Sequence, residues 1–413
     1  MKYFLSILFI TSFYLSLTAQ QKNLDYFINQ GLQNSPLLKD YQFQVLGNRI
    51  DSQRVRASYG PQVNITSTGM YSPVVKGWGY DAAISNLHTY NAVVAVSRTF
   101  VTKPNITNQY LSIQLMNLGL QNQVKISEQE LMRSITQQYI TAYGDLLQIN
   151  FNQKLVALLK NEETVLKKLA EKGVYKQTDF LSFLVNIRQQ ELLIKQLHIQ
   201  YQNNFATLNY LAGLNDTAYT VLEPPPGEIT ALPDLRETVF YNQLTIDSLK
   251  IIANDKQIDF SYKPKVILSA DGGYNSSFAV TPFKNFGVSA GVALTIPIYD
   301  GSQKKMQHQK NAIAEQNRKS HQAFLSTQYS QQIAQLKQQL SLTQQLIEET
   351  DIQIKYAEGL MKAQRQQLIT GDVRIADYII AIGNYLNAKN IVTQNTINKI
   401  QIINQINYWN RKL

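Results

Sequence analysis

The 413-residue sequence contains no cysteine. Without thiols it has neither a disulfide framework nor a thiolate metal site. The histidines show no metal-ligand spacing, no serine stands in a nucleophile-elbow motif, and the glycine-rich segment 269–273 precedes no phosphate-binding helix. These absences predict a protein that is not an enzyme and that uses no cofactor and no metal ion.

Long apolar runs are missing after the first residues. Lys2 precedes an apolar run from Tyr3 to about Leu17, and Ala19 marks an expected cleavage site. The pattern predicts a secretory signal peptide over residues 1–19. An uncleaved anchor helix is the alternative, but cleavage is favoured because the run is shorter than the ~20 residues of a spanning helix. No later stretch reaches 18 consecutive apolar residues. The mature chain is therefore predicted to have no transmembrane helix.

Charge is also sparse. Only 16% of residues are charged, and the formal net charge of +10 comes from cations scattered among glutamine and asparagine residues. Because these cations form no dense basic block, we expect no nucleic-acid partner. The amide-rich, weakly charged stretches suit the wall of a water-filled bore and solvated outer faces equally well.

Proline and glycine are nearly absent from two long stretches. Residues 105–172 contain no proline and only Gly119 and Gly144, and residues 303–370 contain only Gly359. Both are rich in good helix formers, so each is predicted to be one helix of ~100 Å. Helices of such length indicate coiled-coil-like packing against neighbours.

The chain repeats itself. "KGVYKQTDFL" at 172–181 aligns with "TGDVRIADYI" at 370–379, and "ASYGPQVNIT" at 57–66 aligns with "FSYKPKVILS" at 260–269. We infer two repeats, 20–211 and 235–413, joined by a proline-rich linker over 212–234. In each repeat a helix precedes a strand pair and a long helix, and a return helix follows a tip turn, predicted at 173–178 and 371–376.

Each strand pair alternates apolar with small or polar residues, over about 61–100 and about 264–298. Strands of ~10 to 13 residues can cross an outer membrane when tilted, although a soluble sandwich is the alternative. Four strands cannot close a barrel, so the chain must oligomerise, and three copies would supply twelve. Aromatic residues near the strand ends are candidate membrane-interface residues: Tyr71, Trp78, Tyr80, Tyr274, Phe278 and Phe286.

The chain resembles the TolC-like outer membrane efflux proteins, or outer membrane factors, of Gram-negative bacteria. The resemblance rests on the duplicated plan, on "VALTIPIYDGSQ" at 292–303, on "NSPLL" at 34–38 and on the doubled glycine and aspartate of the tips. It implies a mainly α protein with membrane β structure: a long α-helical barrel, or tunnel, and a transmembrane β-barrel shared by a homotrimer, with four strands per protomer.

The resemblance also implies the function and the partners. A TolC-like protein is the exit duct of a tripartite efflux or type I secretion system. It lies in outer membrane lipid with its tunnel in the periplasm, and it docks onto a periplasmic adaptor protein and an inner-membrane transporter of the RND or ABC type. Export through it is passive.

The same resemblance implies an entrance and adaptor-docking tip formed by Gly173, Tyr175, Lys176, Asp179, Gly371, Val373, Arg374 and Asp377. In the family this tip is narrowed by ion pairs and hydrogen bonds. Asp179 and Asp377 are therefore candidate gate residues, but helix capping explains them equally well. Val373 stands where familiar members carry a gating arginine, and Ile380 where they can carry another acid. These departures predict a gate held more by apolar contact than by ion pairs.

Two other interpretations stay open at this point. A trimeric coiled-coil surface or adhesin-like protein would explain the long helices and the signal peptide, but not the two strand pairs. A secreted enzyme would need a polar constellation that the sequence does not display.

Overall fold

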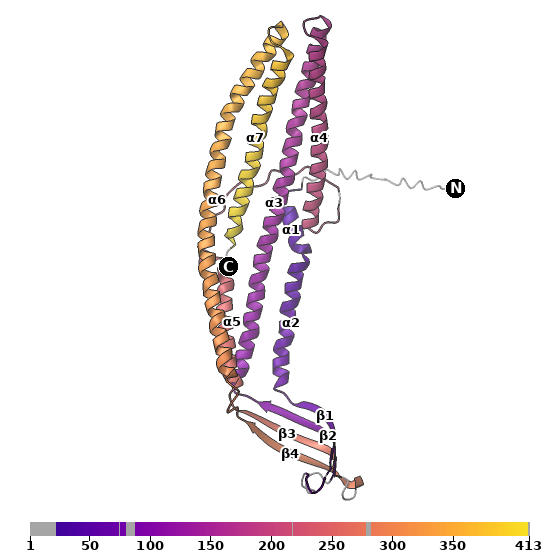
Figure 1. Cartoon of the computed structure of the whole chain (residues 1–413), viewed down its shortest axis with the longest axis vertical. Helices are drawn as coiled ribbons and strands as arrows, with labels where there is room; N and C mark the ends of the chain where they lie inside the picture. Colours follow the sequence, from indigo (N-terminus) through magenta and orange to yellow (C-terminus); the bar gives the residue numbers. More distant parts are fainter. Residues whose placement is uncertain (1–21, 74, 80–86, 217, 278–281, 412–413) are drawn as a thin grey trace, which may run out of the picture. The chain divides into compact units, whose positions relative to one another are not determined.

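A computed structural model describes residues 22–73, 75–79, 87–216, 218–277 and 282–411 (Figure 1). The expected signal peptide and two expected interface aromatics, Tyr80 and Phe278, lie outside these residues. The chain divides into two compact units. The long helices α3 (Lys103–Glu171) and α6 (Gln303–Thr370) each contribute residues to both units.

Among the described residues, the first unit comprises 22–35, 128–216, 218–232 and 331–410. Its helices are α1 (Leu24–Asn34), α4 (Gln177–Leu211) and α7 (Ile375–Asn407), with the second parts of α3 and α6 and a short 3-10 turn η3 (Tyr408–Asn410). Figure 1 shows α4 running back along α3 and α7 running back along α6. The unit is thus built from two helical hairpins.

Aromatic rings fill the base of the first hairpin. Phe27 of α1 packs edge-on against Tyr139 of α3 and Phe205 of α4, each with ring centroids 5.8 Å apart, and all three residues are fully buried. The Tyr139 hydroxyl donates to the carbonyl of Glu223 at 2.8 Å, which ties the proline-rich linker to the helices.

The second unit comprises the described residues of 36–127 and 233–330, together with residue 411. Its helices are α2 (Pro36–Ser58) and α5 (Val239–Ser261), with the first parts of α3 and α6 and two 3-10 turns, η1 (Leu235–Glu237) and η2 (Pro282–Lys284). Its strands are β1 (Gln62–Ser72), β2 (Leu87–Phe100), β3 (Lys265–Ser276) and β4 (Phe286–Thr295).

Buried asparagines join the helices of this unit. Asn108 of α3 donates to the carbonyl of Ala253 of α5, and Asn122 donates to the carbonyl of Val239, both at 2.9 Å. The acceptors descend along α5 as the donors ascend α3, so the two helices are antiparallel. Some of the amide-rich composition therefore lies between helices, a location that the sequence analysis did not consider.

The four strands form one antiparallel sheet in the order β1-β2-β3-β4. The register aligns Val63, Val96, Ala270 and Ala290 in one row, so most of the apolar residues of the four strands share a face. Most of that face is exposed, including Ile65 at 81% and Val288 at 91%. β1 and β4 are the outer strands, and each pairs with only one strand within the described residues. The mainly helical fold with a small antiparallel sheet agrees with the sequence-based expectation.

Candidate functional site

The tips of the two hairpins end their long helices in the same way. Gly173 and Gly371 have φ of +75° and +86°. The next amides reach back into the helix, from Val174 to the carbonyl of Leu169 at 3.0 Å and from Asp372 to that of Gln367 at 2.9 Å. This pattern is the Schellman motif, in which glycine alone avoids a Cβ penalty. We call residues 172–179 the first tip and 370–377 the second tip.

The return helices begin earlier than the sequence analysis expected. α4 starts at Gln177 and α7 at Ile375, and the N-cap residues Lys176 and Arg374 make no side-chain capping bond. The carbonyls of these cap residues already accept the amides of Asp179 at 3.0 Å and Asp377 at 3.1 Å. Both aspartates therefore lie inside the first helical turn. The interpretation of them as side-chain caps is wrong, although a carboxylate there still suits the helix dipole.

Arg374 and Asp377 of the second tip form a two-pronged ion pair. The guanidinium Nε and Nη2 each lie 3.0 Å from a different carboxylate oxygen of Asp377. The pair holds the pKa of the Asp377 carboxyl below its ordinary value and raises the pKa of Arg374, to which the charge of Asp179 also contributes. Within the described residues, no ion pair joins Lys176 to Asp179 in the first tip.

Tyr175 of the first tip contacts the second. Its hydroxyl lies 2.7 Å from the carbonyl oxygen of Leu368 and 2.8 Å from that of Val373, so its one proton is shared between two acceptors. Burial raises the pKa of Tyr175, which keeps the hydroxyl protonated as a donor. The two tips of one chain are thus joined through a tyrosine whose counterpart in the second repeat is Val373.

An apolar cluster lies beneath both tips, and we call it the tip core. Tyr175 and Val373 pack against it from the tips, and Phe180 packs against it from the first turn of α4. Ile380, one of the two departures from the family pattern, points away and is 61% exposed. The buried members come from α3, α4, α6 and α7: Leu155, Leu159, Leu166, Phe183, Ile187, Met361, Leu368, Ile375, Tyr378, Ala381 and Ile382.

A buried ion pair crosses from one hairpin to the other at this level. Glu162 of α3 is 2% exposed and accepts from the Arg365 Nε of α6 at 2.6 Å, while the Arg365 side chain is half exposed. Close by, the buried Tyr378 hydroxyl has no hydrogen-bond partner in the described structure, and burial raises its pKa to about 12. The sequence analysis missed this pair, because nothing in the pattern of two amide-rich helices marks residues 203 positions apart as neighbours.

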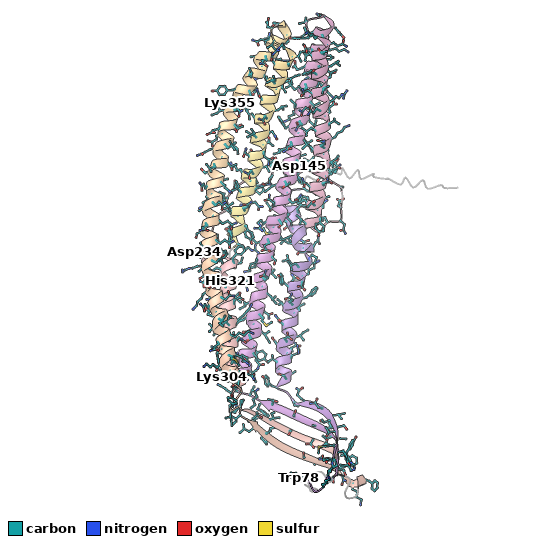
Figure 2. The ribbon with its side chains drawn as sticks, in the orientation of Figure 1. Trp78, Asp145, Asp234, Lys304, His321 and Lys355 are labelled. Carbon is teal, nitrogen blue, oxygen red and sulfur yellow. The ribbon has the colours of Figure 1, made fainter. Side chains whose placement is uncertain are left out.

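The expected interface aromatics lie at the hairpin end of the sheet. Tyr274 contacts Phe286 across the strand pair with centroids 5.4 Å apart, and Tyr71 lies 5.0 Å from the His88 ring. Figure 2 shows Trp78 beyond the strands, where it is 86% exposed. The structure thus gathers Tyr71, Tyr274, Phe286 and Trp78 at one end of the sheet.

Cations cover aromatic rings at the other end, where the strands meet the helices. The Arg98 guanidinium lies 4.9 Å from the Phe100 ring centroid and donates to the carbonyl of Tyr59 at 3.2 Å. Lys263 lies 4.8 Å from the ring of Phe260. Lys304, labelled in Figure 2, lies in the same region. This second aromatic region was not predicted from the sequence. Its signal was the presence of Arg98 and Lys263 within three residues of Phe100 and Phe260.

Metal-ligating side chains form no cluster among the described residues. No group of three or more histidine, cysteine or carboxylate side chains among them is placed to hold an ion. Nor does any described helix have both the length and the apolarity to cross a membrane. The contacts of His308 are with Asp255 at 2.6 Å and Asp259 at 3.3 Å, and they link α6 to α5.

No protein-family model matches the sequence, and no curated protein matches it. Solved structures do match. A membrane protein from Pseudomonas aeruginosa is 13% identical with a TM-score of 0.75, covering 94% of this chain and 90% of that one. The outer membrane protein VceC from Vibrio cholerae is 15% identical with a TM-score of 0.74, covering 94% and 96%. The MtrE outer membrane channel of Neisseria gonorrhoeae, in its open state, is 11% identical with a TM-score of 0.70, covering 94% and 88%.

The chain has the fold of the TolC-like outer membrane channels. The resemblance noted in the sequence is confirmed at the level of the fold. MtrE is an outer membrane channel, and the expectation that this chain is not an enzyme stays a prediction.

Proposed function

We propose that this protein is an outer membrane channel that serves as the exit duct of an efflux or secretion system. One observation carries the proposal: the fold of solved outer membrane channels extends over 94% of this chain, including an open sheet with one apolar face. An apolar face of this kind suits contact with hydrocarbon, and the opposite face of small and polar residues suits water.

The two outer strands support assembly with further copies. An open sheet in lipid would leave a row of unpaired backbone groups along β1 and along β4. Pairing β4 of one copy with β1 of the next satisfies both rows, and because the two edges differ, the arrangement is head-to-tail and closes as a ring. A homotrimer of twelve strands is the assembly we propose.

The two tips are the proposed entrance and the proposed contact with a periplasmic adaptor. Within one chain they are held together by the Tyr175 hydroxyl, the tip core and the Glu162–Arg365 pair. Opening would separate the hairpins at these contacts. An adaptor, driven by an inner-membrane transporter of the RND or ABC type, would supply the interactions that replace them, and export through the duct itself would be passive.

Channel conductance tests the proposal. Purified protein in a planar bilayer should pass ions in steps of one size, and cross-linking should show a trimer. A protein that forms trimers but never conducts would contradict the duct. The alternative of a coiled-coil surface protein is not favoured, because the neighbours in structure are channels. Recovery of the protein from the soluble secreted fraction would support that alternative.

A second measurement locates the entrance. Replacing Asp179 and Asp377 together by alanine removes two of the three tip carboxylates, leaving Asp372, and frees Arg374 from its pair. If the tips form the narrowest part of the duct, single-channel conductance should rise. Glu228→Gln in the linker, which removes one exposed carboxylate elsewhere, is the control and should leave conductance unchanged. Equal conductance of wild type and the double variant would remove the two aspartates from the gate.

A further inference from the structure

The four strands carry one carboxylate. Their 47 residues hold only three formal charges, Arg98, Lys265 and Asp271. Lys265 is the first residue of β3, and Asp271 lies in the middle of that strand. Arg98 shares the apolar face with Phe100 and Val96, because residues two apart point the same way.

Asp271 lies on the opposite face. The register places it directly across from Ala95 of β2 and Ser289 of β4, and Asn64 of β1 continues the row. Its neighbours two positions away along β3 are Ser269 and Gly273. The residues around the carboxylate are therefore uncharged, and Asp271 is partly exposed.

The carboxylate is oriented but not neutralised. The Ser289 hydroxyl donates to Asp271 Oδ2 at 2.6 Å, and no ion pair reaches Asp271 within the described residues. At Gly273, a Cβ would clash with the carbonyl of Ala92, so glycine is required there and the wall beside the carboxylate carries no side chain. A serine donor fixes the direction of the charge without reducing it.

We infer that Asp271 makes the duct selective for cations over anions at the level of the sheet. The inference rests on the proposed function, since it needs the polar face to line a water-filled bore. Each copy in the assembly contributes one Asp271, and a ring of carboxylates of this kind attracts cations and repels anions in cation channels. A unit charge acting across ~8 Å of water changes the local ion concentration about twofold.

The reversal potential in a potassium chloride gradient at low ionic strength tests this inference. Asp271→Asn should lower the ratio of cation to anion permeability about twofold or more, and Asp271→Lys should lower it further. Ser289→Ala removes the hydrogen bond and keeps the charge, so it should retain selectivity. Glu228→Gln is the control for loss of a carboxylate elsewhere. The difference between wild type and Asp271→Asn should shrink in concentrated salt, where the Debye length is short.

The possible failures are distinguishable. If wild type and Asp271→Asn conduct equally well and have the same reversal potential, the inference is wrong and the proposed function stands. If the wild type passes no ions, the proposed function is wrong and the inference falls with it. If the Asp271→Asn variant does not insert into the bilayer, Asp271→Ser supplies a second neutral variant. The same loss of selectivity is expected from it.

Discussion

The two tips share a motif and differ in what holds them. Both end a long helix at a glycine with positive φ and start the next helix four residues later. The ion pair of the second tip is internal, because Arg374 binds Asp377 three residues later in the same tip. The first tip is attached to its neighbour, because the Tyr175 hydroxyl bonds carbonyls of the second hairpin. The shared motif specifies a turn, and the residues that differ decide how the hairpins are connected.

This comparison separates contacts that must break when the hairpins part from contacts that move with one hairpin. The Tyr175 bonds and the Glu162–Arg365 pair cross between hairpins. The Arg374–Asp377 pair does not.

The largest effect is expected from Arg365→Ala. It leaves the Glu162 carboxylate buried without its cation, and removal of one partner of a buried pair is strongly destabilising. Because the Arg365 side chain is half exposed and water can replace part of it, we expect a loss of ~2 kcal/mol, below the range for fully buried pairs. Denaturant unfolding of the detergent-solubilised protein measures it.

The matched variant for this pair replaces both residues, Glu162→Gln with Arg365→Gln. It removes both charges and leaves no buried carboxylate, so it should regain most of the lost stability. If the single and double variants are equally unstable, the cost comes from packing and not from an unpaired charge.

The glycines come next. Alanine at either position must adopt a left-handed conformation, at a cost of roughly 1–2 kcal/mol. A Cβ at Gly173 would meet nothing within 4 Å, whereas one at Gly371 would lie 3.2 Å from Val174 Cγ1. Gly371→Ala should therefore destabilise more than Gly173→Ala in thermal unfolding. Adding Val174→Ala should bring the two to the same level, and an unchanged gap would show that the steric argument is wrong.

A smaller loss is expected from Tyr175→Phe. The ring still packs against the tip core, but the carbonyls of Leu368 and Val373 lose their shared donor, at about 1 kcal/mol for one hydrogen bond. Tyr356→Phe makes the same chemical change at a 76% exposed position of α6 and should have no effect. Conductance adds a second measurement: if the hairpins part during opening, Tyr175→Phe should open more often. Equal stability of the two variants would refute the connecting role of the hydroxyl.

Local features of this fold could be predicted from the sequence, and long-range contacts could not. The lack of proline and the helix-ending glycines Gly173 and Gly371 predicted the bounds of α3 and α6 to within two residues. Such prediction works because the continuation and termination of a helix depend on nearby residues. Alternation located the strands, and the register then placed most of their apolar residues on one face.

The helix starts and the interhelical contacts were beyond such reasoning. The acidic residues of the tips suggested side-chain caps, but backbone hydrogen bonds to Lys176 and Arg374 start the helices earlier. Glu162 and Arg365 resemble many other charged residues on solvated helix faces. Only the packing of two hairpins shows that Glu162 is buried, since burial there depends on residues of a different helix.

The smallest effect concerns Arg374 and Asp377, and it depends on pH. The pKa of Asp377 is below its ordinary value of 3.8 in the folded protein, chiefly through the hydrogen bonds from Arg374. The folded state therefore binds this proton less tightly than the unfolded state, and the pair contributes stability that is present above pH 3.8 and is lost as the pH falls through the lower folded pKa. The melting temperature of Asp377→Asn should lie slightly below that of wild type at pH 7 and meet it in strong acid.

A double-mutant cycle of Arg374→Gln with Asp377→Asn should be non-additive, whereas Lys176→Gln with Asp179→Asn should be additive. Because the Arg374–Asp377 pair lies within one hairpin, Asp377→Asn alone should alter this pH dependence without making the channel open more often. Tyr175→Phe, in contrast, should increase opening. An equal gain in opening from both variants would mean that the Arg374–Asp377 pair also helps to hold the two hairpins together.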